Sequence, residues 1–209
     1  LHNTGQSGGT SDKDIDAPEA WEISTGSDII VAVTDTGVNY SHPDLAANMW
    51  RNPGEIPDDG IDNDGNGYID DIYGIDEADG DCDPMDDDGH GSHCAGIIGA
   101  VGNNTLGVVG VNWRVRIMAL DFFDSRGWGE EANAIKCIEY AIRHGARVIS
   151  ASWGGDPYNP ALYDAIELAG KSNILFVAGA GNDGKNNDVT PFYPSSYSNE
   201  NIIAVAASD

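Results

Sequence analysis

The sequence predicts an α/β domain of three layers, α/β/α, with a mostly parallel central sheet. Five short runs are almost continuously apolar, as strands buried on both faces are: 28–35, 115–121, 146–152, 173–181 and 201–208. Segments with apolar residues at helical spacing lie between them. Strands that alternate with helices are typical of a parallel sheet covered by helices on both faces.

Three helices are expected between these strands. The segment 90–102 is rich in small residues, so a helix there would pack tightly. The segment 129–145 places Ala134, Cys137, Ile138 and Ala141 on one face and ends at Gly145, a favourable residue for closing a helix. The segment 159–173 has a similar pattern.

Length and composition favour one domain with a sizeable core over residues 1–209. Hydrophobic residues make up 40% of the chain, and no apolar run reaches the 18 residues expected of a membrane span. The start at Leu1 carries no signal peptide and suggests a processed end or a fragment boundary. Three cysteines allow at most one disulfide, and Cys94 is expected to be a packed, unreactive thiol.

The chain is strongly acidic, with 35 acidic and 10 basic residues and a net charge of −25. This charge excludes nucleic acid as an expected partner, because phosphate binding needs lysine and arginine. Many of the acidic residues gather in a loop-like segment, 52–88. A solvated acidic surface explains scattered carboxylates, whereas clustered ones favour a bound cation such as Ca²⁺.

Three polar residues lie at the ends of predicted strands or at the start of a predicted helix. In an open parallel sheet, functional groups lie at the carboxyl ends of the strands. Asp35 ends the first strand, His90 begins the small-residue helix, and Asn182 follows the strand 173–181. Each has a plainer interpretation: Asp35 and Asn182 suit turns, and His90 suits a helix N-cap. Their order and placement together favour a functional site.

The motifs around these residues resemble the subtilisin-like serine proteases, or subtilases. The resemblance covers 14–209 and rests on "VAVTDTG" (31–37), "GHGSHCAG" (89–96), "SWGG" (152–155), "AGAGND" (178–183) and "FYPSSY" (192–197). It implies a subtilisin-like fold truncated at its C-terminus, with 1–209 as a single incomplete peptidase domain.

The resemblance also implies the roles of the three residues. His90 would be the general base, Asp35 would orient its imidazole, and Asn182 would donate to the oxyanion. The family's nucleophile lies in a Gly-Thr-Ser-x-Ala motif after the last strand found here, so we expect that serine beyond this chain. The alternatives are a non-catalytic calcium-binding module and an inactive homologue. A metal hydrolase that uses His90, His93 and the aspartates is disfavoured.

By the same resemblance, a polypeptide substrate would bind as an added strand between two segments. These are Gly127, Trp128 and Gly129 on one side and Ser152, Trp153 and Gly154 on the other. Gly179 and Ala180 would line the pocket for the side chain before the cleaved bond (P1). Phe192 would stand at its floor and make it shallow, with Asp183 giving an acidic rim.

A calcium loop is predicted at "DNDGNGYIDD", 62–71. Its spacing matches the first part of an EF-hand loop, with Asp62, Asp64, Asn66, Tyr68 and Asp70 as ligands. Tyr73 stands where that loop has its bidentate glutamate, and Asp71 is a candidate substitute. The alternative is an acidic solvated turn.

A second calcium site is implied by the resemblance alone. The loop "GNNTLGVVG" (102–110) would supply carbonyls of Gly102, Leu106 and Val108 and the side chain of Asn104. Asp44 would supply the carboxylate, and Gln6 is a further candidate ligand.

The resemblance further implies a secreted protein made as a zymogen. Its partners would be polypeptide substrates and its own propeptide or C-terminal fragment.

Overall fold

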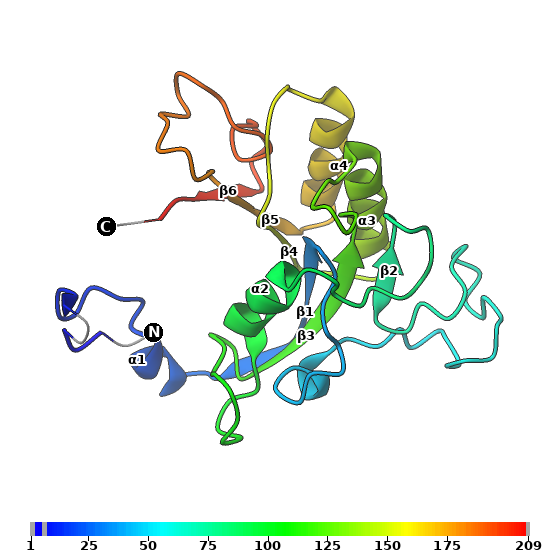
Figure 1. Ribbon diagram of the computed structural model, residues 1–209, viewed down its shortest axis with the longest axis horizontal. Helices are drawn as coiled ribbons and strands as arrows, with labels where there is room; N and C mark the ends of the chain where they lie inside the picture. Colours follow the sequence, from blue (N-terminus) through cyan, green and yellow to red (C-terminus); the bar gives the residue numbers. More distant parts are fainter. Residues whose placement is uncertain (1–2, 6–7, 208–209) are drawn as a thin grey trace.

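A computed structural model describes residues 3–5 and 8–207. Its centre is a six-stranded sheet in the order β2-β3-β1-β4-β5-β6, with every neighbouring pair parallel (Figure 1). The predicted α/β fold with a parallel sheet is confirmed.

The strands follow the predicted apolar runs closely. They are β1 (Gly26–Asp35), β3 (Arg114–Asp121), β4 (Val148–Ala151), β5 (Leu175–Gly179) and β6 (Ile202–Val205). The last run was expected to continue to 208, a residue that lies outside the described part. The central strands are buried on both faces, which is why they lack alternation; Ala32, Val33, Ile117 and Met118 are fully buried.

The helices form the two outer layers. On one face lies α2 (His90–Gly99), and on the other lie α3 (Glu131–Arg143) and α4 (Pro160–Lys171). The core divides accordingly. Ala95 and Ala100 pack with Val33 and Ile117 beneath α2, while the larger core under α3 and α4 includes Ile138, Leu162 and Phe176.

Three further elements were not predicted. The short strand β2 (Gly74–Asp76) extends the sheet from within the segment 52–88, which was expected to be loop throughout. A strand of three residues is too short to show a period in the sequence. The others are α1 (Ala17–Trp21) and a 3₁₀ turn (Ala46–Asn48).

The strand order reverses at β1, and this reversal positions the candidate site. The chain places β3 on one side of β1 and β4 on the other. Right-handed crossovers in opposite directions put α2 and α3 on opposite faces. The carboxyl end of β1 is therefore the switch point where an open parallel sheet forms its binding crevice.

Candidate active site

Asp35 and His90 form a close pair at this switch point. Asp35 is the last residue of β1 and His90 is the first of α2. Nδ1 of His90 lies 2.6 Å from Oδ1 of Asp35. The Asp35 side chain is 2% exposed and the His90 side chain 50%, so the carboxylate is buried behind a ring that faces the solvent.

This arrangement sets the tautomer of the imidazole. An ionised carboxylate only accepts hydrogen bonds, so Nδ1 of His90 carries the proton and Nε2 keeps its lone pair. The backbone N–H of Thr36 donates to the same oxygen of Asp35 at 2.9 Å and helps to hold the carboxylate in place. His90 is thus oriented as a base with its free nitrogen on the accessible side of the ring.

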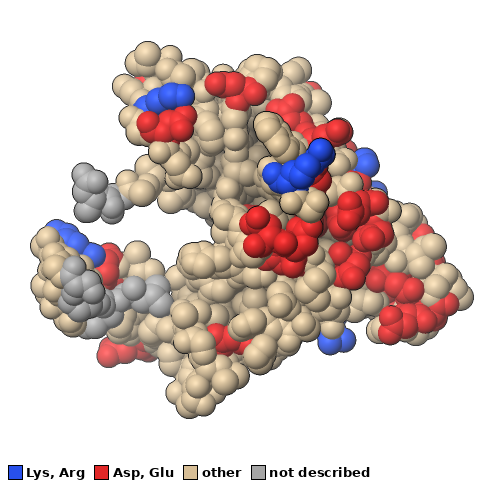
Figure 2. Space-filling view, in the orientation of Figure 1, with Lys and Arg blue, Asp and Glu red and all other residues tan. Residues whose placement is uncertain are grey.

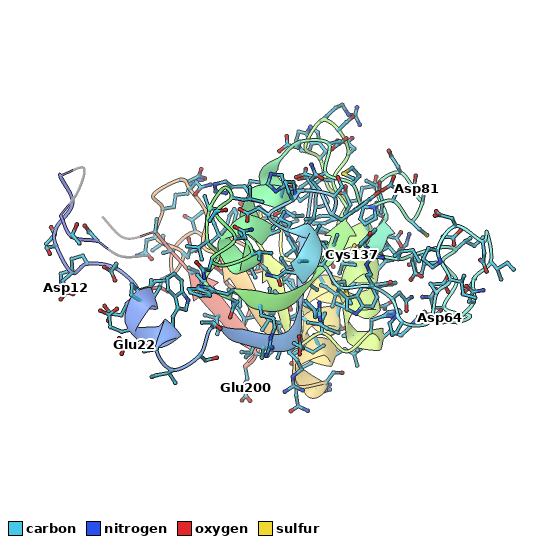
Figure 3. The ribbon with its side chains drawn as sticks, turned by 90° about the horizontal axis from the view of Figure 1, so that it is seen from below. Asp12, Glu22, Asp64, Asp81, Cys137 and Glu200 are labelled. Atoms are coloured by element: carbon cyan, nitrogen blue, oxygen red, sulfur yellow. The ribbon has the colours of Figure 1, made fainter. Side chains whose placement is uncertain are left out.

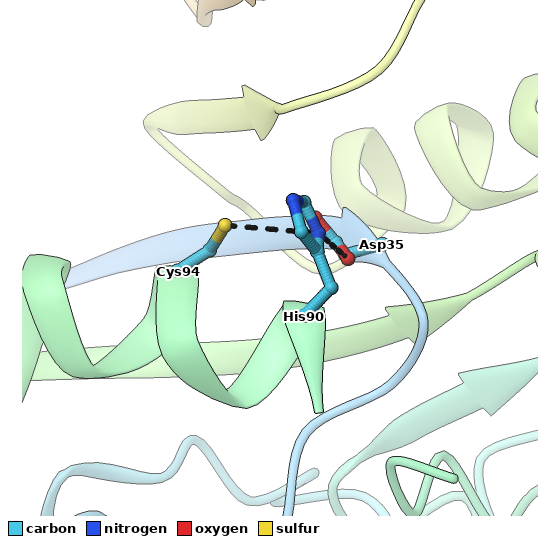
Figure 4. Close-up of side chains that lie close together, drawn as sticks. All are labelled: Asp35, His90 and Cys94. Atoms are coloured by element: carbon cyan, nitrogen blue, oxygen red, sulfur yellow. Dashed lines mark hydrogen bonds and ion pairs between the residues drawn. The ribbon is translucent and has the colours of Figure 1, made fainter. Parts of the chain in front are cut away.

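Cys94 lies one helical turn after His90 and faces the same pair (Figure 4). Its Sγ is 3.9 Å from Nδ1 of His90 and donates to Oγ of Ser152 at 3.5 Å. Burial raises the pKa of this thiol, so at neutral pH it is protonated and a poor nucleophile. The expectation of an unreactive thiol is consistent with this environment, although Cys94 lies at the site and is only partly buried.

A cleft of about 460 Å³ connects this pair with the other predicted residues. His90 and Asn182 both line it. The remaining predicted residues on its walls are Ser152, Trp153, Gly154, Gly179, Ala180, Asp183 and Phe192. Residues of α2 and of the segments that follow β4 and β5 therefore line one cleft, and Asp35 of β1 lies behind His90.

The segment 127–129 lies outside the lining of this cleft. It belongs to a small loop closed by a bridge between Phe123 and Gly129, and the Trp128 side chain is 76% exposed. Gly129 packs directly on the Phe122 ring, whose centroid is 5.0 Å from that of Trp153. Phe122 thus separates the two segments predicted to flank a substrate strand.

Phe192 fills space next to the cleft. A Cβ built on Gly154 would lie 2.4 Å from the Phe192 ring, and one on Gly181 would lie 3.4 Å away. The ring is therefore held between two glycines and also borders a neighbouring cavity of about 670 Å³. Asp183, expected to give an acidic rim, is paired with Lys185 at 2.8 Å, which offsets its charge.

Comparison with known proteins decides the family. The model of the subtilase family matches residues 26–209. The chain belongs to the subtilase family. The match includes β1 with Asp35, α2 with His90 and the loop after β5 with Asn182. The subtilisin-like three-layer fold follows from this match together with the sheet described above.

Individual subtilases resemble the chain over most of its length. Subtilisin-like protease 1 of Plasmodium berghei is 39% identical over 168 residues, which are 80% of this chain and 28% of that protein. Thermitase of Thermoactinomyces vulgaris is 38% identical over 195 residues, 93% of this chain and 60% of that enzyme. A thermophilic serine proteinase of a Bacillus species is 38% identical over 191 residues. The chain thus spans 28–60% of the lengths of the first two relatives.

His93 takes no part in the site of this subtilase. It lies on the exposed side of α2 and lines a different cavity together with His42 and Ile97. Among the described residues, the groups able to hold a metal do not include His93. A two-histidine metal centre with His90 therefore has no geometric support.

The predicted calcium loop brings carboxylates close together, but Glu55 belongs to the group and Asp70 does not. Oxygens of Glu55, Asp62 and Asp64 all lie within 4.8 Å of one another. Glu55 was missed because it lies seven residues before the motif. Asp70 was predicted but faces away: its left-handed backbone (φ 56°) turns the carboxylate to the amides of Asp59 and Gly60.

Asn66 and Asp71 adjoin this group. The Asn66 amide donates to Asp64 at 3.2 Å and to Asp71 at 2.8 Å, while Tyr68 contributes its N–H to Asn66 at 2.8 Å. Asp71 is fully buried and also accepts from Tyr140 of α3 at 2.5 Å. In the described part of the chain, no lysine or arginine pairs with Glu55, Asp62, Asp64 or Asp71.

The carboxylates of this loop lie in a strongly acidic part of the surface. Acidic side chains crowd one side of the molecule (Figure 2), and Asp64 and Asp81 lie toward that end, opposite Asp12 and Glu22 (Figure 3). Three close carboxylates without a protein cation repel one another. Such a group of hard oxygen ligands fits Ca²⁺.

The second predicted calcium site also comes together in part. Asp44 is 2% exposed and accepts from the Asn104 side chain at 2.6 Å and from the Val108 N–H at 2.9 Å. Leu106 donates its N–H to Asn104 at 3.0 Å. A Cβ built on Gly102 would meet the Trp113 ring, and Gln6 lies outside the described residues. A buried carboxylate with only neutral partners fits a cation.

Two more buried carboxyls stand beside Asp35 at the same edge of the sheet. Asp121 of β3 pairs in register with Asp35 of β1 and with Asp76 of β2. Burial, together with the charge of Asp76, raises the pKa of Asp121 to about 8. The Asp121 carboxyl next to Asp35 is therefore held toward its protonated form at neutral pH.

Proposed function

We propose that this chain is part of a calcium-stabilised serine endopeptidase of the subtilisin type. The nucleophilic serine would be supplied from sequence beyond residue 209. The observation that carries this proposal is the 2.6 Å contact between buried Asp35 and His90 at the edge of a cleft that Asn182 also lines. The family and its named serine proteinase relatives support the same reaction class.

The chemistry follows from the orientation of His90. Its free Nε2 would take the proton from the serine hydroxyl as that oxygen attacks the peptide carbonyl. The same nitrogen would then return the proton to the leaving amine. Asp35 would stabilise the imidazolium formed in between, and the Asn182 amide would donate to the oxyanion.

The substrate would lie along the segment 152–154, with its P1 side chain near Gly179, Ala180 and Phe192. Because the Phe192 ring occupies the space between Gly154 and Gly181, a small P1 residue fits this cleft best. The segment 127–129 would form the opposite edge, with the exposed Trp128 contacting residues farther from the cleaved bond.

Calcium would bind at two places and act on stability. Glu55, Asp62 and Asp64, with Asn66, Asp71 and the Tyr68 carbonyl, would hold one ion; Asp44 and Asn104, with loop carbonyls, would hold another. Bound Ca²⁺ would neutralise repelling carboxylates and tie the loops to the sheet.

A secreted protein made as a zymogen suits these sites, because extracellular calcium reaches the millimolar range in which weak sites are filled. The partners would be polypeptide substrates and an inhibitory propeptide. None of the described helices is long and apolar enough to cross a bilayer.

Hydrolysis of an unfolded polypeptide by the protein in its natural length tests this function. The wild-type protein should cleave this polypeptide, and a zinc chelator should not change its activity. The His90→Ala variant should be inactive. An intact substrate with the wild type would favour the non-catalytic calcium-binding alternative. Loss of activity with the zinc chelator would favour a metal hydrolase.

A further inference from the structure

Asp86 lies between the two elements that carry Asp35 and His90. Its Oδ1 accepts from the Thr36 hydroxyl at 2.9 Å and from the Gly89 N–H at 2.7 Å. The Asp88 N–H donates to the same oxygen at 3.1 Å. Its Oδ2 accepts from the Ser92 N–H at 2.8 Å. One carboxylate thus receives donors from the end of β1 and from the first turn of α2.

Thr36 continues this connection toward the pair. Its hydroxyl donates to Asp86 and accepts from the Gly91 N–H at 3.0 Å. Its own N–H donates to Asp35 at 2.9 Å. Thr36 is 6% exposed, so these bonds are shielded from water and are stronger than surface ones.

The two elements also touch directly at Gly91. A Cβ built there would lie 2.0 Å from the Gly37 carbonyl oxygen and 3.1 Å from Cβ of Asp35. The helix therefore starts in backbone contact with the turn after β1. A small rotation of this first turn would change the distance between His90 and Asp35.

Asp86 is ionised in this environment. Burial opposes its ionisation, but hydrogen bonds from Ser92, Gly89 and Thr36 outweigh that effect and lower its pKa. The four hydrogen bonds described above are all donated to Asp86, three to Oδ1 and one to Oδ2. Both side-chain oxygens must therefore be acceptors. An asparagine of the same shape would turn its NH₂ group toward at least one of these donors.

We propose that Asp86 is a positioning residue for the general base: it fixes the first turn of α2 to Thr36 and so holds His90 against Asp35. It touches neither the substrate nor the imidazole. Its effect on turnover rests on the proposed function, whereas its effect on the Asp35–His90 contact does not.

The neighbouring aspartates provide the comparison. Asp87 is exposed and makes no hydrogen bond or ion pair in the described part of the chain. Asp87→Asn therefore removes one negative charge from the aspartate run 86–88, as Asp86→Asn does, but leaves the hydrogen bond between Asp86 and Thr36 in place. Thr36→Val removes the bridging hydroxyl and leaves all acidic residues in place.

The test compares wild type, Asp86→Asn, Asp87→Asn, Thr36→Val and the Asp86/Thr36 double variant, all in the natural-length protein. Nuclear magnetic resonance of ¹⁵N-labelled histidine follows the Nδ1 proton and the titration of His90. Steady-state kinetics on a peptide substrate gives kcat and KM, and thermal melting reports folding.

In Asp86→Asn and Thr36→Val, we expect the Nδ1 proton signal of His90 to broaden or disappear. We expect kcat to fall roughly 10- to 100-fold with KM within about twofold, as a misplaced catalytic group produces. The double variant should be no worse than the more severe single one, because both changes break one connection. Asp87→Asn should stay within about twofold of wild type.

The proposal would be overturned if the Asp86→Asn variant folds and has the same Nδ1 proton signal and the same kcat as the Asp87→Asn variant. If Asp86→Asn does not fold, Thr36→Val decides it by the same two measurements. If the wild type has no peptidase activity, the proposed function fails, and the Nδ1 signal alone still decides whether Asp86 holds the pair.

Discussion

His90 lies 55 positions after Asp35 in the chain, yet its Nδ1 is 2.6 Å from Oδ1 of that carboxylate. The strand order explains this contact, because β1 lies where that order reverses and α2 begins over the same edge of the sheet. The fold therefore supplies the meeting point, and local hydrogen bonds at Thr36 and Asp86 set its geometry.

Asn182→Ala should lower kcat roughly 10²- to 10³-fold and leave KM nearly unchanged. The lost amide would donate chiefly to charge that develops in the transition state. Steady-state kinetics on one peptide substrate checks this. Asn186→Ala, which changes an amide in the loop after the cleft, serves as control. A large rise in KM with constant kcat would place Asn182 in ground-state binding.

Removing Ca²⁺ with a chelator should lower the melting temperature, and adding it back should restore it. Glu55→Gln and Asp44→Asn should each weaken the response to calcium, because each removes a carboxylate that we assign to a separate site. Glu139→Gln, on the exposed face of α3, is the control. Equal melting temperatures with and without calcium would contradict both sites.

Phe192→Ala should shift P1 preference toward larger side chains. The ring that fills the space between Gly154 and Gly181 would be gone, so kcat/KM for a phenylalanine P1 substrate should rise about 10- to 100-fold relative to alanine. A peptide pair that differs only at P1 measures this ratio. An unchanged ratio would mean that the P1 side chain binds elsewhere.

Asp121→Asn should change how stability depends on pH. The pKa of Asp121 is raised from 3.8 to about 8 in the folded protein. Between these values the unfolded state has lost this proton and the folded state keeps it, so rising pH lowers the free energy of unfolding. The slope from this one group approaches about 1.4 kcal/mol per pH unit.

The asparagine variant lacks this contribution. Its stability relative to wild type should therefore increase as pH rises from about 4 to about 8. Urea unfolding at several pH values checks this, with Asp164→Asn on the exposed side of α4 as control. A difference that stays constant over this pH range would show that Asp121 is ionised in the folded state.

The sequence was sufficient to predict the main strands and the pair at the switch point. The apolar runs that end at Asp35 and before Asn182 are unambiguous, because central parallel strands are buried on both faces. The short β2 was missed, since Gly74–Asp76 has too few residues for a period and is a strand only because β3 lies beside it.

Contacts between distant residues were harder to predict from sequence. Glu55 joins Asp62 and Asp64 through the folding of the acidic loop, not through motif spacing. Asp70 fits the spacing but is turned away by its left-handed backbone. Asp86 stands within a run of aspartates, and its hydrogen bonds to Thr36 and Ser92 distinguish it only in three dimensions.

The most direct test of the central claim is labelling of the natural-length protein with a fluorophosphonate, followed by mass mapping of the labelled residue. We expect one labelled serine outside residues 1–209, and we expect labelling to be lost in His90→Ala. Labelling that persists in His90→Ala, or a wild type that takes no label, would contradict the assignment of Asp35 and His90 as the base of a serine peptidase.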